Sequence, residues 1–205
     1  ISLAASGPLF LAISPTLPVK SVKELIALAK AKPGQLANGS AGTGTVGHLA
    51  GEYFKIMSGT DILHVPYKGG AQAATDAMSG FIQILFDPSS SVAPYIRTGR
   101  LRGLAVTGTV RTKAFPDLPT VAEAGVPGYE VTTWGGIIAP TGVPVAIVTR
   151  LSEEMRKAAA SAFVIERYAP LGADPVASTP EEFTALIRRE FTKWATVVKR
   201  IGLKL

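Results

Sequence analysis

The residues best suited to do chemistry form a glycine-rich segment ahead of an amphipathic stretch. The segment reads Asn38-Gly39-Ser40-Ala41-Gly42-Thr43-Gly44-Thr45-Val46-Gly47-His48. Glycines let the backbone approach a ligand closely, and the serine and threonine hydroxyls supply hydrogen-bonding oxygens. The first amides of a following helix have no partner within that helix and lie at the positive end of its dipole. This segment is therefore a candidate binding site for a carboxylate or a phosphate.

The glycines also match the dinucleotide pattern G-x-G-x-x-G, but their surroundings argue against a nucleotide site. A dinucleotide-binding first strand is strongly apolar, and Gln35–Asn38 is not. The next predicted strand, Ile62–Pro66, ends without the acidic residue that would hold a ribose, and no lysine stands where a P-loop requires one. We expect no cofactor, and a nucleotide-binding α/β enzyme is the least favoured alternative.

Catalytic and metal sites have little support. The chain has two histidines: His48, in the first turn of a predicted helix, is expected to bond the preceding loop, and His64 is expected in a strand. Neither has further metal ligands at a suitable spacing, so we expect no metal site. The run Ser89–Ser91 is interpreted as a helix N-cap rather than as a nucleophile. The sequence therefore predicts a protein that is not an enzyme.

Three predicted strand ends carry polar or small residues, and ligands of open parallel sheets bind outside the carboxyl ends of strands. These ends are Asn38–Thr45, Tyr67–Gly70 and Phe86-Asp87. Tyr67 offers a flat wall with a hydroxyl, Lys68 a cation, and Asp87 an acceptor for an ammonium or hydroxyl group. The alternative for Lys68 and Asp87 is an ion pair with each other or at the surface.

The elements that must position these residues alternate between short apolar runs and helical patterns, which indicates an α/β protein. The patterns predict strands over residues 7–14, 36–39, 62–66, 81–86, 101–107 and, as an extended stretch, 129–140. They predict helices over residues 22–32, about 46–57, 71–78, 90–97, 120–124, 144–161, 163–171 and 180–201. Thr179 and Glu182 form a capping box at the last of these.

Composition and charge set broad limits. Hydrophobic residues make up 47% and charged residues 18% of the chain, which is typical of a globular protein. Cysteine is absent, which excludes disulfides and thiolate chemistry. The net charge of +6 is scattered, with its densest cluster at Arg188, Arg189, Lys193, Lys199, Arg200 and Lys204, so we expect no nucleic-acid partner. No apolar run could span a bilayer, and no signal peptide is expected.

The ordered motifs resemble those of the tripartite tricarboxylate transporter receptors, the Bug family. The match includes Gly39-Ser40, Gly42, Gly44-Thr45, His48–Glu52, His64–Gly69, Phe86-Asp87, Gly103–Thr107, Leu118–Gly125 and Trp134-Gly135. The resemblance implies a type II periplasmic-binding-protein-like α/β fold with two lobes joined by crossing strands near Leu9–Ile13 and Val131–Ile138. It assigns residues 14–131 to a complete second lobe, and residues 1–13 and 132–205 to a truncated first lobe.

The resemblance further implies a periplasmic receptor that binds a di- or tricarboxylate, an acidic amino acid or an aromatic acid and delivers it to membrane transporter subunits. The ligand-binding residues implied are Ser40, Gly42, Thr43, Gly44, Thr45, Val46, His48, Tyr67, Lys68, Gly69, Phe86 and Asp87. The family's first strands and helices would precede Ile1, so we expect weakened binding and a homo-oligomer through the uncovered first-lobe sheet. A ligand-sensing or interaction module reusing the fold, cytoplasmic if the chain naturally lacks a signal peptide, is the alternative.

Overall fold

The computed structural model describes residues 1–169 and 173–203 of the chain. Leu171, the expected end of one helix, and Lys204 of the basic cluster lie outside the described residues. The strands are β1 (Ser2–Ile13), β2 (Ala37–Ser40), β3 (Leu63–Pro66), β4 (Ile84–Pro88), β5 (Arg102–Val106), β6 (Thr132–Ile137) and β7 (Asp174–Pro175). The helices are α1 (Val22–Ala31), α2 (Val46–Ser58), α3 (Gly70–Ser79), α4 (Ser89–Arg97), α5 (Val145–Ala159), α6 (Ala162–Tyr168) and α7 (Pro180–Ile201).

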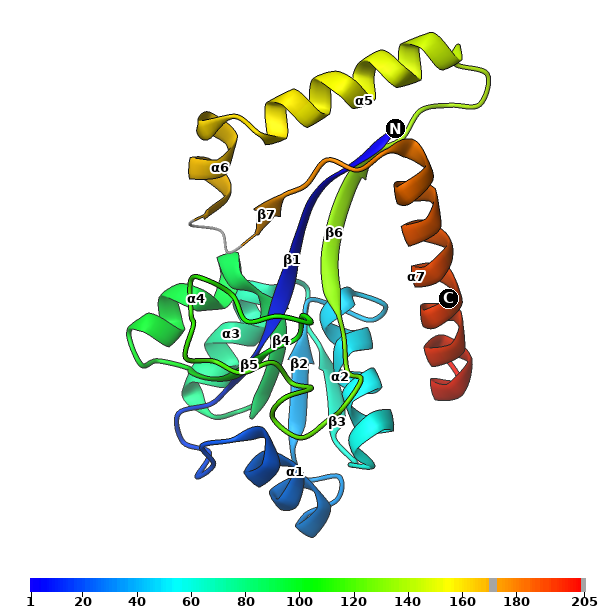
Figure 1. Ribbon diagram of the computed structural model, residues 1–205. Helices are drawn as coiled ribbons and strands as arrows, with labels where there is room; N and C mark the ends of the chain where they lie inside the picture. The colour runs from blue at the N-terminus through cyan, green and yellow to red at the C-terminus, as the bar shows by residue number, and fades with distance from the viewer. Residues whose placement is uncertain (170–172, 204–205) are drawn as a thin grey trace.

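Strand β1 runs through both parts of the molecule (Figure 1). Its second half, Leu9–Ile13, pairs antiparallel with β4 and β5 in a sheet of order β3-β2-β4-β1-β5, in which β2 is parallel to β3 and β4. Its first half, Ser2–Pro8, pairs with β6 and β7. We call residues 9–131 the packed region, and residues 1–8 with 132–203 the open region.

The packed region has a core on each face of its sheet. Leu9, Leu11 and Ile13 pack with residues of α1 and α2, whereas Phe10 and Ala12 pack with residues of α3 and α4. All five side chains are fully buried. Successive side chains of a strand point to opposite faces, so a strand covered on both sides must be apolar throughout. The continuous apolar run in β1 follows from this requirement.

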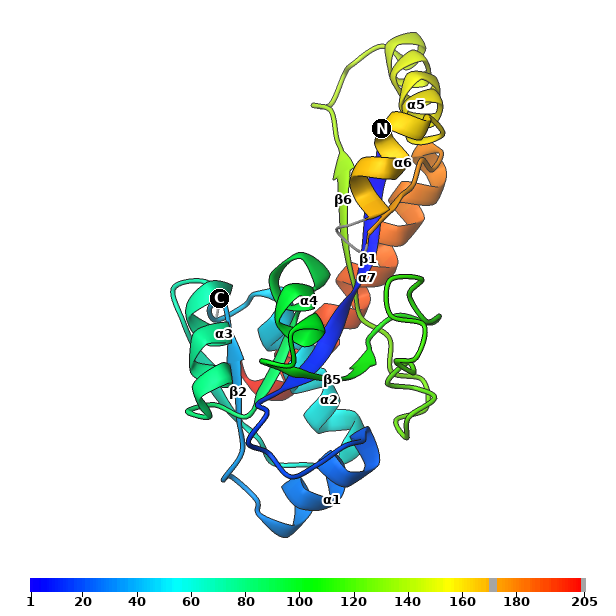
Figure 2. The same ribbon diagram turned by 90° about the vertical axis from the view of Figure 1, so that its left-hand side faces the viewer.

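The open region consists of the paired strands β1 and β6, the short strand β7, and helices α5 to α7 around them (Figure 2). The predicted capping box at Thr179 and Glu182 is present at the start of α7. Helix α7 returns to the packed region, where Trp194 meets the Tyr53 ring of α2 and Lys193 donates to the carbonyl of Glu130.

Two expectations about the elements were wrong, and one strand was missed. Strand β1 begins at Ser2 rather than Gly7, because β6 and β7 pair with a stretch of small and polar residues that has no strand pattern of its own. Strand β7 was not predicted. Residues 120–124 form a turn rather than a helix: Thr120 and Glu123 exchange capping bonds, but Gly125, at φ 129°, ends the turn.

The boundary predicted between lobes, at Ile13, falls at the end of β1. The structure places Leu9–Ile13 in the sheet of the packed region, and the strand pairing that links the two regions involves Ser2–Pro8 and β6. Among the described residues, no helix is both long and apolar enough to cross a membrane.

Candidate functional site

The three predicted strand ends lie together. Strands β2, β3 and β4 are neighbours and run in the same direction, so the segments that follow them meet at one edge of the sheet. A Cβ on Gly42 would lie 3.4 Å from the Tyr67 carbonyl oxygen, and one on Gly70 would lie 3.0 Å from Asp87 Oδ2. The structure therefore brings the segments 40–48, 67–70 and 86–87 into contact with one another.

Each of the helices that start at this edge lacks a side-chain N-cap. The N-cap residues of α2, α3 and α4 are Thr45, Gly69 and Pro88, and none accepts a bond from a helix amide. By contrast, α1, α6 and α7 are capped by the hydroxyls of Ser21, Ser161 and Thr179. Helix α5, in the open region, starts at Pro144 without a side-chain cap as well.

The Thr45 hydroxyl is turned away from its own helix. It donates to the carbonyl of Gly42, at 2.7 Å, and it accepts no bond from the first turn of α2. The serine cap proposed for α4 was also wrong: Ser89 is the first residue of that helix, after Pro88, and its buried hydroxyl has no partner among the described residues. Unpaired amides at a helix start are available to an anion.

The amides of the glycine-rich loop divide into two groups. Those of Gly42, Gly44 and Thr45 donate within the protein, to Ser40 Oγ, His48 Nδ1 and the Gly42 carbonyl. Those of Thr43, Val46 and Gly47 donate no hydrogen bond to the described part of the chain. The internal bonds fix the shape of the loop and leave a second set of amides free.

Glycine is required at Gly47 by close packing and at Gly44 by conformation. A Cβ on Gly47 would stand 2.5 Å from the carbonyl oxygen of Phe86, which is a backbone atom. Gly44 has φ 80°, a region that favours glycine. Gly47 therefore lets the start of α2 press against β4, beside Asp87.

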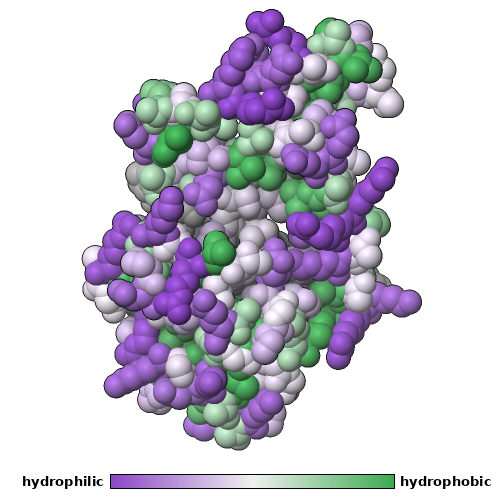
Figure 3. Space-filling model, viewed as in Figure 1, coloured by the Kyte–Doolittle hydropathy of each residue, from purple (hydrophilic) through white to green (hydrophobic). Residues whose placement is uncertain are grey.

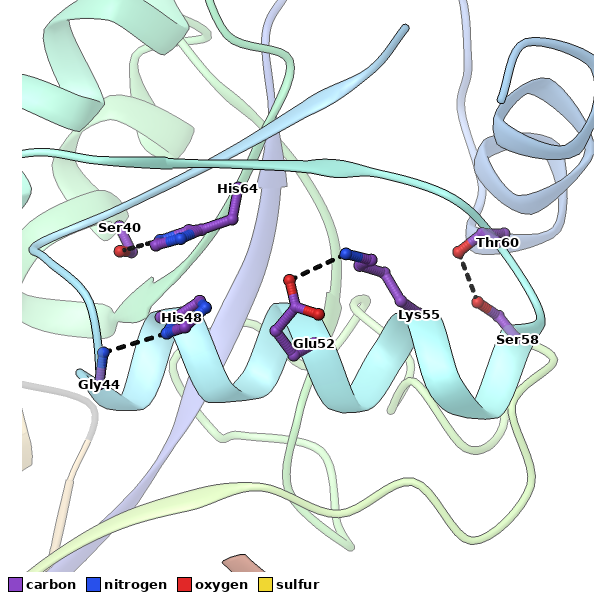
Figure 4. Close-up of polar contacts among 8 residues, drawn as sticks. All are labelled: Ser40, Gly44, His48, Glu52, Lys55, Ser58, Thr60 and His64. Carbon is purple, nitrogen blue, oxygen red and sulfur yellow. Dashed lines mark hydrogen bonds and ion pairs between the residues drawn. The ribbon is translucent and has the colours of Figure 1, made fainter. Parts of the chain in front are cut away.

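Two imidazoles lie beside this loop (Figure 4). His48, 5% exposed, accepts the Gly44 amide at Nδ1 over 3.0 Å, which confirms the predicted bond between this ring and the preceding loop. His64, in β3 as expected, bonds Ser40 Oγ through Nε2 at 2.7 Å. Burial lowers the pKa of both imidazoles, that of His64 to about 4, so both rings are neutral at pH 7.

The remaining predicted site residues differ in what they present. The Tyr67 hydroxyl donates to Asp76 on α3, and burial together with this bond raises the pKa of the phenol to about 12. Lys68 is exposed, and no ion pair joins it to Asp87 or to another acid among the described residues. The ring of Phe86 lies in the core against Phe54, so only its backbone faces the loop.

Asp87 is the one acid at this edge whose titration is strongly shifted. Burial raises the pKa of its carboxyl to about 6, although a bond with the Ser91 side chain opposes the rise. Its buried Oδ2 has no hydrogen-bond partner in the described structure. Asp87 therefore carries only part of a negative charge near pH 6, which limits its repulsion of an anion at the adjacent helix starts.

Asn38 was named at a strand end but given no role. It is 3% exposed, its Oδ1 has no partner among the described residues, and its Nδ2 would lie 2.1 Å from a Cβ on Gly51. A buried amide oxygen without a donor partner is costly, which signals that this position depends on its surroundings. No group of three or more metal-ligating side chains gathers anywhere in residues 1–169 and 173–203.

Comparison with known proteins adds independent evidence. Residues 1–203 match the family described as "Tripartite tricarboxylate transporter family receptor". BugT of Bordetella pertussis is 35% identical over 205 residues, which is all of this chain and 63% of BugT. The chain thus spans less than two thirds of that relative.

Solved structures agree in fold. Rpa4515 of R. palustris, solved with adipate, superposes with a TM-score of 0.88 at 36% identity, over 98% of this chain and 68% of that one. The periplasmic binding protein BugD gives a TM-score of 0.84 at 30% identity, over 100% of this chain and 69% of BugD. The predicted two-lobe α/β fold, with one lobe complete and the other partial, is confirmed.

Proposed function

Because the chain belongs to the tripartite tricarboxylate transporter receptor family, we propose that it binds a small organic carboxylate where α2, α3 and α4 begin. The family is one of solute receptors rather than enzymes. The observation that carries the proposal is the meeting of three uncapped helix starts at the carboxyl edge of β2, β3 and β4. The adipate named with Rpa4515 is a ligand of this chemical class.

In this proposal the free amides of Thr43, Val46 and Gly47 hold one ligand carboxylate. The positive end of the α2 dipole adds to these bonds. Lys68, exposed and unpaired in the described structure, supplies a cation at the rim. The Asp87 carboxyl, with its pKa raised to about 6, accepts a hydrogen bond from the rest of the ligand when ionised and can donate one when protonated. The ligand classes that the family resemblance implies are a di- or tricarboxylate, an acidic amino acid and an aromatic acid, and each brings the carboxylate that this proposal requires.

In this proposal the site supplies one wall of a ligand cleft. All the groups in this proposal belong to the packed region, while the relatives extend well beyond the length of this chain. A charge-assisted hydrogen bond contributes about 1.5–3 kcal/mol, so two or three bonds supplied from elsewhere would account for roughly two to six orders of magnitude in affinity. We expect these 205 residues alone to bind carboxylates with dissociation constants above about 1 μM, and nanomolar binding by the monomer would contradict this.

A substitution that removes one amide tests the site. Val46 is the first residue of α2, where proline is tolerated, and Thr45 before it is already extended (φ −69°, ψ 161°). Val46→Pro removes the Val46 N–H and should weaken adipate binding about tenfold or more in calorimetry. The matched control is Val145→Pro, at the first position of α5 and 80% exposed.

Equal loss of affinity in both variants, or no loss in Val46→Pro, would contradict the proposed carboxylate site at the start of α2. Unfolding curves of both variants show whether the helices persist. Titration with malate, glutamate and citrate defines the ligand class. Binding of NAD or ATP without binding of any carboxylate would instead favour the nucleotide enzyme.

We also propose a periplasmic receptor that delivers its ligand to membrane transporter subunits. BugD is named a periplasmic binding protein, which supports this compartment for a relative of the same fold. Cell fractionation of the protein expressed from its own gene tests it. Recovery in the cytoplasm with a soluble protein partner would favour the sensor or interaction module.

A further inference from the structure

Two stacked histidines hold the two ends of one tight turn. The ring centroids of His48 and His64 are 3.7 Å apart, with planes inclined by 22°. His64 bonds Ser40 Oγ where the turn begins, and His48 accepts the Gly44 amide where it ends (Figure 4). Ser40 Oγ in turn bonds the amide and carbonyl of Gly42. The turn 40–44 is therefore tied to α2 and β3 through two imidazole rings.

The bond from Gly44 fixes the protonation state of His48. A backbone N–H can only donate, so Nδ1 must carry a lone pair and the ring proton must be on Nε2. The Ser40 hydroxyl requires no lone pair on His64: its single proton goes to the Gly42 carbonyl, so it accepts from a protonated Nε2 of His64. Of the two rings, only His48 has a loop contact that requires an unprotonated nitrogen.

We propose that His48 is a positioning residue, whose neutral imidazole holds Gly44 so that the amides of Thr43, Val46 and Gly47 stay free for an anion. The predicted effect of His48 on ligand binding rests on the proposed function. The hydrogen bond by which His48 holds Gly44 does not depend on the proposed function.

Protonation of His48 would remove the anchor. Nδ1 would become a donor facing the Gly44 N–H, and a positive charge would appear in the first turn of α2, at the unfavourable end of the dipole. The charged groups around the ring are Glu52 and Lys55 of α2, which form a 2.9 Å ion pair, and the titratable His64 of β3. Glu52 favours a charged His48, whereas Lys55 and burial oppose it.

These opposing influences give the anchor its pH range. Burial is the largest of them, and the pKa of His48 lies below 6.5 as a result. The loop is therefore held at neutral pH and released as the pH falls through the lowered pKa of His48. A receptor built this way would lose carboxylate affinity on acidification beyond the loss caused by protonation of the ligand itself.

The first test needs no ligand. Amide hydrogen exchange, expressed as a protection factor, is measured by NMR for Gly44 from pH 8 to pH 4.5. We expect Gly44 to be protected at pH 8 and to lose protection in step with the His48 ring titration. His48→Asn keeps an acceptor near the Nδ1 position without a titrating group, so its protection should not depend on pH. His48→Phe keeps a ring against His64 but no acceptor, so Gly44 should exchange freely at every pH.

The second test uses adipate. The ratio of wild-type to His48→Asn affinity cancels the ionisation of the ligand, and we expect that ratio to fall as the pH drops through the His48 titration, by about tenfold once His48 is protonated. His48→Phe should bind more weakly than His48→Asn at pH 7.5. Equal Gly44 protection in wild type and His48→Phe, or a pH-independent affinity ratio, would overturn the inference.

The two tests separate this inference from the proposed function. If adipate and the other carboxylates fail to bind while Gly44 protection changes with the His48 titration, the role of His48 in holding Gly44 is supported and the binding role of the loop is contradicted. If binding depends on Val46 but Gly44 protection does not depend on His48, the proposed carboxylate site is supported and the role of His48 in holding Gly44 is contradicted.

Discussion

The packed and open regions use helices of the same amphipathic kind and bury them to very different extents. Helices α1 to α4 each bury at least three residues against the sheet. In α5 the only buried residue is Ser152, α6 buries none, and α7 buries three of its 22 residues. A periodic apolar stripe thus predicts a helix but does not show that the described part of the chain contains its partner.

The apolar side chains of the open region reach the surface in several places, as the green patches in the upper part of Figure 3 show. The large exposed ones are Ile137, Ile138, Val145, Ile147, Leu151, Phe163, Ile165, Ile187 and Phe191. A groove of about 580 Å³ follows α7, between Trp134 and Val198. Exposed apolar patches of this kind mark surfaces that pack against something else.

The largest expected effect comes from making one substitution in both regions. Phe54, on α2, is fully buried, whereas Phe191, on α7, is 76% exposed. Phe54→Ala should lower the free energy of unfolding by about 3–5 kcal/mol, because it leaves a cavity in a close-packed core. Phe191→Ala should change it by less than about 0.5 kcal/mol. Urea unfolding measures both, and similar losses would mean that Phe191 is covered in solution.

The next effect concerns self-association, which we propose for these residues through the exposed apolar face of the open region. Phe191→Glu should weaken association about tenfold to a hundredfold, since a buried aromatic anchor contributes roughly 1–3 kcal/mol to an interface. Phe81→Glu is the control, because Phe81 is 81% exposed but belongs to the packed region. Sedimentation measures the change, and a wild-type protein that stays monomeric at micromolar concentrations would refute the association.

The third effect is a pH dependence of the stability of the packed region, in which two groups act in opposite directions. The pKa of His64 is about 4 in the fold and 6.5 otherwise, so its contribution to stability is complete above pH 6.5 and is lost as the pH falls towards 4. The pKa of Asp87 is about 6 in the fold and 3.8 otherwise, so its contribution is complete below pH 3.8 and is lost as the pH rises through 6.

These two trends oppose each other between pH 4 and pH 6. Asp87→Asn should therefore expose the histidine trend, with a loss of about 1–2 kcal/mol on acidification from pH 7 to pH 4 relative to wild type. His64→Gln should expose the opposite trend. Glu154→Gln, at an exposed ion pair of the open region, should leave the pH profile of unfolding unchanged. Identical profiles in all three variants would contradict this account.

The smallest effect compares helix caps. Ser21 caps α1 in the packed region, and Thr179 caps α7 in the open region. Ser21→Ala should lower the global free energy of unfolding by about 1 kcal/mol. Thr179→Ala should mainly speed hydrogen exchange at the start of α7, near Phe183, because that end can fray locally. A global loss in Thr179→Ala as large as in Ser21→Ala would show that both regions unfold together.

Local signals were enough to predict most elements. The run at Leu9–Ile13 and the capping box at Thr179 each act within a few residues of the chain. The first half of β1 and all of β7 carried no such signal, because their pairing partners supply the strand. At the site, the loop before His48 was found from its composition, but its division into bonded and free amides was not.

The sequence alone determined where the backbone could bind a ligand. Glycines, hydroxyl residues and the start of a helix are recognised from adjacent residues. Only the tertiary structure decided that three uncapped helix starts share one edge, that Tyr67 turns to Asp76, and that Lys68 and Asp87 remain apart. It also decided that His48 anchors Gly44 while stacked on His64. These outcomes depend on the parallel order of β3, β2 and β4, which joins residues tens of positions apart and which no local pattern encodes.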